Sequence, residues 1–146
     1  MKIRTLTAII LGFSLFLTSD VSAKGISSAK CSFADGNNQF FNNGKLTYSI
    51  ERTKELMELS FDRLDAPDGK ARLIGNNGSA DVNVSMGTHT LNIIEITPSG
   101  NWNVLTILTN DITHGAKLQA VYSRHVTTGF ALVPSQRVGY CQIFTM

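Results

Sequence analysis

Turn-forming residues recur about every ten positions after residue 40, and this spacing constrains the fold more than any other feature of the chain. Asn, Asp, Gly, Pro and Ser favour turns because they preset φ or tolerate positive φ. The turn clusters lie at 42–44, 66–69, 76–78, 87–88, 98–101 and 110–115. Short segments with alternating apolar and polar residues separate them, as in β-strands. The spacing predicts an all-β, antiparallel meander of eight or nine strands.

The alternation also identifies the residues that we expect to face the core. These are Leu46, Tyr48 and Ile50; Met57, Leu59 and Phe61; Ala71 and Leu73; Val82, Val84 and Met86; and Leu118, Ala120 and Tyr122. Segments 91–97 and 102–109 are apolar on both faces, as in central strands, and 138–144 is the expected closing strand.

One segment, 51–64, is also rich in helix formers, so a helix is the alternative there. The alternation of Met57, Leu59 and Phe61 favours instead a hairpin that turns near Thr53 and Lys54. An antiparallel sheet of this size must protect its edges, and closure into a barrel removes them. A closed barrel is therefore favoured over a two-sheet sandwich. Eight strands enclose either packed side chains or one small ligand, and the sequence does not distinguish these cases.

The chain contains two cysteines, Cys31 and Cys141, near opposite ends of the predicted domain. We predict a disulfide between them, which would place the first and last strands side by side. Two isolated cysteines without a CxxC motif are a weak metal signal, so neither a metal site nor a cofactor is predicted.

The N-terminal residues have the three-part layout of a secretory signal peptide. Lys2 and Arg4 precede an apolar run at 9–17, and small residues precede a cleavage site after Ala23. The apolar run is shorter than the ~20 residues of a membrane-spanning helix. We therefore expect residues 1–23 to be removed and residues 24–146 to form a single domain, secreted or periplasmic, without a membrane span.

Charge gives no indication of a nucleic-acid partner. Residues 24–146 carry 11 basic and 10 acidic side chains, and no basic run stands out among them.

The densest polar cluster is Ser123, Arg124 and His125. Consecutive strand residues point to opposite faces, so Ser123 and His125 share a face that Arg124 does not. This spacing differs from the nucleophile–base–orienter geometry of a hydrolase, and we predict no catalytic residues. We expect a polar strand end at the barrel rim, with ligand contact as the alternative.

Arg124 has the parity of Leu118, Ala120 and Tyr122, which predicts an inward guanidinium. An inward arginine needs a carboxylate or several acceptors. Glu95 has the parity of its apolar neighbours, so we predict an Arg124–Glu95 pair inside the barrel or at its mouth.

Trp102 is the only tryptophan, and it follows a turn at 98–101. We expect it to plug one end of the barrel, with stacking on a ligand as the alternative. His89 and His114 adjoin turn glycines, which indicates exposed loop positions.

The C-terminal half carries one resemblance. Gln119–His125, Pro134–Gln136 and Gly139–Cys141 together resemble a group of small secreted bacterial proteins of unassigned activity. The resemblance covers about 40 residues. It implies export and a β-rich fold, and it implies no reaction.

These features favour an exported, non-enzymatic binding protein. Its partner would be a small amphipathic ligand inside the barrel or a protein at the rim, with Arg124, Glu95, His125, Ser123 and Trp102 as candidate contacts. A secreted or periplasmic hydrolase using residues at the barrel mouth is one alternative. An envelope structural or stress protein without a small ligand is another. The oligomeric state is not predicted.

Overall fold

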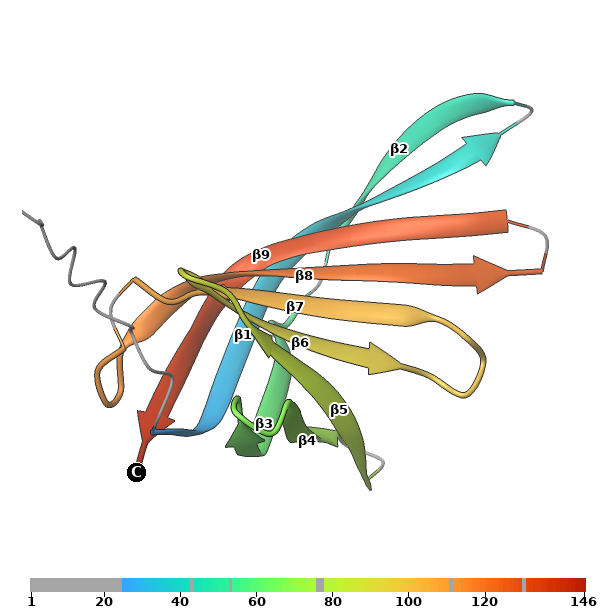
Figure 1. Ribbon diagram of the computed structural model, residues 1–146. Helices are drawn as coiled ribbons and strands as arrows, with labels where there is room; N and C mark the ends of the chain where they lie inside the picture. Colours follow the sequence, from blue (N-terminus) through green and yellow to red (C-terminus); the bar gives the residue numbers. More distant parts are fainter. Residues whose placement is uncertain (1–24, 43, 53, 76–77, 111, 130) are drawn as a thin grey trace, which may run out of the picture.

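The computed structural model describes residues 25–42, 44–52, 54–75, 78–110, 112–129 and 131–146, and the predicted signal peptide lies outside them. Nine strands and no helix make up the described residues (Figure 1). The strands are β1 (Ile26–Asn42), β2 (Lys45–Glu51), β3 (Met57–Asp65), β4 (Lys70–Gly75), β5 (Gly78–Met86), β6 (Thr90–Ile96), β7 (Trp102–Leu108), β8 (Lys117–Thr128) and β9 (Ala131–Thr145). The prediction of an all-β fold is confirmed.

Eight of the strands form a closed antiparallel barrel. From β3 to β9, each strand pairs with the next one along the chain, and β1 closes the ring by pairing with both β3 and β9. The turn-forming clusters of the sequence follow β1 and each strand from β3 to β7, whereas none of them marks the β2–β3 or β8–β9 connection. The closed meander is therefore the predicted one, with β2 as an additional strand outside the ring.

β1 is long enough to have two neighbours in succession along one edge. Its first part, at Ala29–Phe33, pairs with β3, and its last part, at Gly36–Asn42, pairs with β2. The β1–β2 hairpin therefore extends beyond the barrel (Figure 1). The predicted hairpin turning near Thr53 and Lys54 is wrong, because β2 and β3 pair with β1 rather than with each other.

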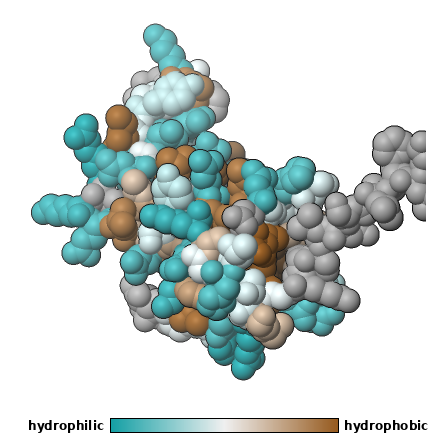
Figure 2. Space-filling model, turned by 90° about the vertical axis from the view of Figure 1, so that its left-hand side faces the viewer, coloured by the Kyte–Doolittle hydropathy of each residue, from teal (hydrophilic) through white to brown (hydrophobic). Residues whose placement is uncertain are grey.

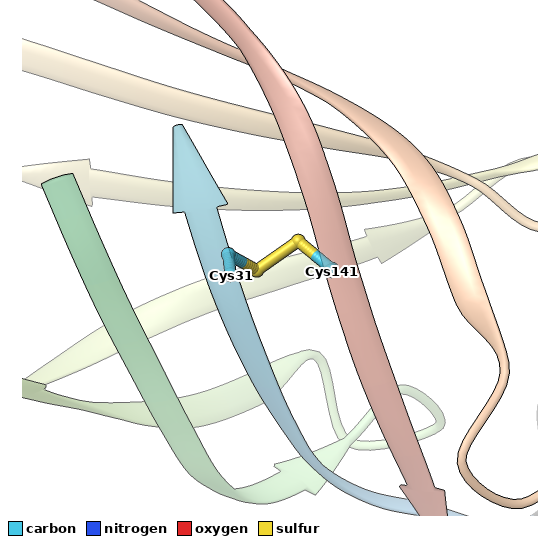
Figure 3. The surroundings of a disulfide bond; sticks show 2 residues. All are labelled: Cys31 and Cys141. Carbon is cyan, nitrogen blue, oxygen red and sulfur yellow. A yellow bond between two sulfur atoms is a disulfide. The ribbon is translucent and has the colours of Figure 1, made fainter. Parts of the chain in front are cut away.

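A disulfide joins Cys31 and Cys141 across the β1–β9 seam (Figure 3). The two residues are direct cross-strand partners, their Cα atoms lie 3.9 Å apart, and both side chains are buried. The bridge covalently joins the strands that close the ring. Both the predicted bridge and the predicted neighbours are confirmed.

Side chains fill the interior of the barrel. The core contains Phe33, Phe61, Leu91, Ile93, Leu105, Ile107, Leu118, Tyr122 and Ile143, together with the disulfide. Met57, Leu59, Leu73 and Met86 pack against this core, as their alternation predicted. Leu46, Tyr48 and Ile50 do not: they are 46%, 65% and 69% exposed, because β2 lies outside the ring.

Gly139 on β9 shows how tightly the closing seam is packed. It lies opposite Phe33 on β1 and Ala120 on β8. A Cβ atom at this position would lie 2.8 Å from the ring of Phe33 and would collide with the carbonyl oxygen of Ser32. Only glycine leaves space for Phe33 to enter the core here.

None of the described residues forms a helix that is long and apolar enough to cross a membrane.

Candidate functional site

A polar layer lies across three neighbouring strands at one end of the barrel. Glu95 on β6 is the cross-strand partner of Asn103 on β7, which is the partner of Arg124 on β8. Opposite residues in an antiparallel pair share a face, so all three have the inward parity of Ile93, Leu105 and Tyr122. The register thus gives Arg124 and Glu95 the inward parity that the sequence predicts.

The predicted pair between Arg124 and Glu95 is wrong, because Glu95 is paired with Asn103 instead. Asn103 lies between them and donates from Nδ2 to Oε2 of Glu95 at 2.6 Å. Among the described residues, no ion pair joins Arg124 to Glu95. The Oδ1 atom of Asn103 is buried and has no hydrogen-bond partner in the described part of the chain.

Tyr122 and Arg137 are cross-strand partners directly below this layer. Burial raises the pKa of the Tyr122 phenol and is the largest effect on it. Nearby charges have smaller effects: Arg124 and Arg137 lower this pKa, and Glu95 raises it. Arg137 is 4% exposed and makes an ion pair with Glu51. The guanidinium groups of Arg124 and Arg137 and the carboxylate of Glu95 thus lie near the phenol of Tyr122, at the end of the apolar core.

The void that the described residues leave beneath this layer is too small for a ligand. The void bordered by Leu59, Phe61, Glu95, Asn103 and Tyr122 has a volume of about 10 Å³. A single water molecule needs roughly 10–15 Å³. Of the two possibilities that the strand count left open, the filled barrel is the one observed, and a ligand there would have to displace core side chains.

The other three candidate residues lie on the outer face. Trp102 is the cross-strand partner of His125, and it is 49% exposed. The predicted role of Trp102 as a plug is wrong, because its parity directs it away from the core. Ser123 Oγ accepts a hydrogen bond from Gln136 Nε2 at 3.3 Å. Within the described residues no hydrogen bond joins Ser123 to His125, so this pair offers no nucleophile–base arrangement.

A broad groove of about 1070 Å³ lies on the outer face of the barrel, over the seam between β1, β8 and β9. Apolar side chains from several strands line much of it: Leu56, Leu108, Val121, Val138 and Tyr140. All five are at least one-third exposed. Val121 and Val138 are direct cross-strand partners, so they form one continuous apolar patch across β8 and β9.

Positive charge lies along one side of the groove. Gln142 on β9 is flanked by Lys30 on β1 and by Lys117 on β8. The two lysines are thus two strand spacings apart, or roughly 10 Å. The Lys117 ammonium also lies 4.8 Å from the centroid of the Tyr140 ring, an arrangement that holds it beside an apolar surface. Among the described residues that line the groove, Glu58 is the only acidic one.

None of the five candidate residues from the sequence lines this groove. A signal for it was nevertheless present. Val121, Val138 and Tyr140 alternate with the buried residues Ala120, Tyr122 and Cys141, so β8 and β9 are apolar on both faces. In a closed barrel one of those faces must be outside, where apolar residues remain available for contact.

One end of the barrel has a surface of mixed polarity. Figure 2, which views the end of the barrel at the left of Figure 1, shows hydrophobic and hydrophilic residues interspersed. His89, His114 and His125 are all exposed, and no group of three or more His, Cys, Asp or Glu side chains in the described part of the chain could hold a metal ion.

No protein-family model and no curated protein matches this chain.

Proposed function

We propose that this chain is an exported, non-enzymatic binding protein that binds small anionic amphiphiles in the outer groove. The observation that carries the proposal is an apolar groove of about 1070 Å³ with two lysines on one side. Ligand sites in proteins commonly have volumes of about 300–1,000 Å³ and combine an apolar lining with a few placed polar groups.

Each part of such a ligand has a matching part of the groove. An acyl or aromatic body would cover Val121 and Val138 and reach the ring of Tyr140. Burial of apolar surface stabilises such a complex by about 25 cal/mol per Å² before the entropic cost of association is subtracted. A carboxylate, sulfate or phosphate head would lie beside Lys30 and Lys117, where it neutralises their charge.

Export is supported by the sequence and by the disulfide. The N-terminal layout ending at Ala23 is that of a signal peptide. The Cys31–Cys141 bridge is compatible with an oxidising compartment outside the cytoplasm, where such bonds persist. Mass spectrometry of the protein from a host that expresses the full-length gene tests this directly: we expect an N-terminus at Lys24 and two oxidised cysteines.

Isothermal titration with three probes of equal chain length tests the binding proposal. Dodecanoate should bind about tenfold more tightly than dodecyltrimethylammonium, because the two lysines attract the first and repel the second. Dodecanol should lie between them. Equal affinity for the anionic and cationic probes, or no binding of any of the three, would contradict the proposal.

A matched pair of variants on one strand locates the site. Val138 and Leu132 are both exposed residues of β9 with the same parity, but only Val138 lines the groove. Val138→Asp should weaken dodecanoate binding by about tenfold or more, since it removes apolar contact and adds a repulsive charge. Leu132→Asp should leave the affinity unchanged. Equal effects of the two variants would place the ligand elsewhere.

The charge can be tested separately. The double variant Lys30→Gln/Lys117→Gln should reduce the preference for dodecanoate over dodecyltrimethylammonium to near unity while dodecanol binding persists. Lys70→Gln, which removes an exposed lysine outside the groove, should retain the preference. An unchanged preference in the double variant would exclude these lysines as the anion contacts.

A further inference from the structure

We infer that β2 is a dimerisation edge, at which a second copy of this chain adds its own β2 in antiparallel orientation with Tyr48 on the two-fold axis. This inference concerns a surface that the proposed ligand site does not use.

β2 is the one described strand that pairs with a neighbour on a single side. It pairs with β1 on one side, and the sheet order ends with it on the other. Every second residue of an edge strand directs its N–H and C=O groups away from the sheet, where another strand can pair with them. The β1–β2 hairpin extends beyond the barrel in Figure 1, so the barrel wall does not cover this edge.

The exposed side chains add an apolar surface to the unpaired backbone. Leu46, Tyr48 and Ile50 share one face of β2 and are 46%, 65% and 69% exposed. Proteins commonly protect such edges with proline or with charges along the strand. β2 contains no proline, and its two charged residues, Lys45 and Glu51, lie at its ends.

The order of residues in β2 makes it complementary to itself. Its sequence, KLTYSIE, has the same chemical class at equal distances from Tyr48: hydroxyl residues next to it, then aliphatic residues, then opposite charges. Antiparallel pairing about Tyr48 would place Lys45 opposite Glu51 of the second copy. It would also place Leu46 opposite Ile50, and Thr47 opposite Ser49.

This register is the one that pairs all seven residues of β2. Any shift leaves residues at the ends unpaired and separates Lys45 from Glu51 of the second copy. Opposite charges and matched apolar residues in cross-strand pairs stabilise a sheet, whereas like charges facing each other destabilise it. Because antiparallel pairing of identical strands is two-fold symmetric, each favourable pair occurs twice, and the contact closes as a dimer.

Glu51 remains available for this contact. Its carboxylate is bound by Arg137 through Oε1, and its side chain is 40% exposed. A carboxylate accepts several hydrogen bonds, so the lysine of the second copy can approach its other oxygen.

Analytical ultracentrifugation of the exported, oxidised protein tests the inference. A seven-residue edge is a small interface, so we expect a monomer–dimer equilibrium that depends on concentration up to the millimolar range. Lys45→Glu should weaken the dimer by about tenfold, because it places two pairs of carboxylates opposite each other. Lys54→Glu makes the same charge change outside β2 and should leave the equilibrium unchanged.

Cysteine cross-linking tests the register independently of folding stability. Under mild oxidation, Tyr48→Cys should form a covalent dimer by itself, since the residue faces its own copy. Leu46→Cys should cross-link efficiently only when mixed with Ile50→Cys. A strict monomer at millimolar concentration would overturn the inference. So would a dimer that is insensitive to Lys45→Glu, or equal cross-linking at all three positions.

Discussion

The Nη2 atom of Arg137 lies 2.6 Å from Oε1 of Glu51, and this ion pair connects the last strand of the barrel to the hairpin that extends beyond it. Arg137 also donates from Nη1 to the carbonyl oxygen of Ala34 at 2.9 Å. Its side chain is 5% exposed, so a charged group is held in the protein by two contacts from the N-terminal part of the chain.

Removal of this carboxylate should destabilise the protein. Glu51→Gln removes the carboxylate charge that pairs with the buried guanidinium, and a hydrogen bond to a charged group contributes about 1.5–3 kcal/mol. We expect a loss of that size in the free energy of unfolding, measured with urea. Glu55→Gln, the same change at an exposed position nearby, should unfold like the wild type. Equal stability of the two variants would show that Arg137 does not depend on Glu51.

The disulfide should contribute more than any single ion pair. The bridge joins residues that are 110 positions apart, and closing a loop of that length stabilises a fold by roughly 4–5 kcal/mol in the chain-entropy model. Cys31→Ala/Cys141→Ala should lower the free energy of unfolding by about this amount. In the native protein, both cysteines should be unreactive toward thiol reagents; quantitative labelling without a reductant would contradict the bridge.

Tyr122 should make stability fall at alkaline pH. Burial raises the pKa of its phenol above the ordinary value of 10.0. The unfolded chain therefore releases this proton at a pH where the folded chain retains it, so the free energy of unfolding decreases as the pH rises through 10. Tyr122→Phe should reduce this decrease between pH 9 and 11, as measured by urea unfolding. Tyr140→Phe, which removes an exposed hydroxyl, should retain it.

Gly139 should be intolerant of any side chain. Gly139→Ala introduces a Cβ atom against Phe33 and the carbonyl of Ser32 at the closing seam, and overpacking of this kind costs about 1–3 kcal/mol or more. We expect a clear decrease in Tm. At Gly75 on β4 the nearest atom to an added Cβ is 3.8 Å away, so Gly75→Ala should change Tm little. A wild-type Tm for Gly139→Ala would mean that the seam can open without loss of stability.

The sequence predicted an all-β meander and the disulfide, and it favoured a closed barrel over a two-sheet sandwich. Turn clusters follow β1 and each strand from β3 to β7 because their residues adopt turn dihedral angles at low cost. Alternation assigns the two faces because successive side chains point in opposite directions. These local rules were sufficient to predict that Arg124 and Glu95 face inward, since the register of β6, β7 and β8 is continuous at these residues.

Tertiary structure decided which alternating segments are covered. Leu46, Tyr48 and Ile50 alternate as regularly as Met57, Leu59 and Phe61, but only the second set reaches the core. The difference arises because β3 pairs with the part of β1 inside the ring, whereas β2 pairs with the part that extends beyond it. Likewise, Asn103 separates Glu95 from Arg124, and the groove unites residues of β1, β8 and β9. Alternation fixes which residues share a face, but contacts between segments distant in the chain decide what that face meets.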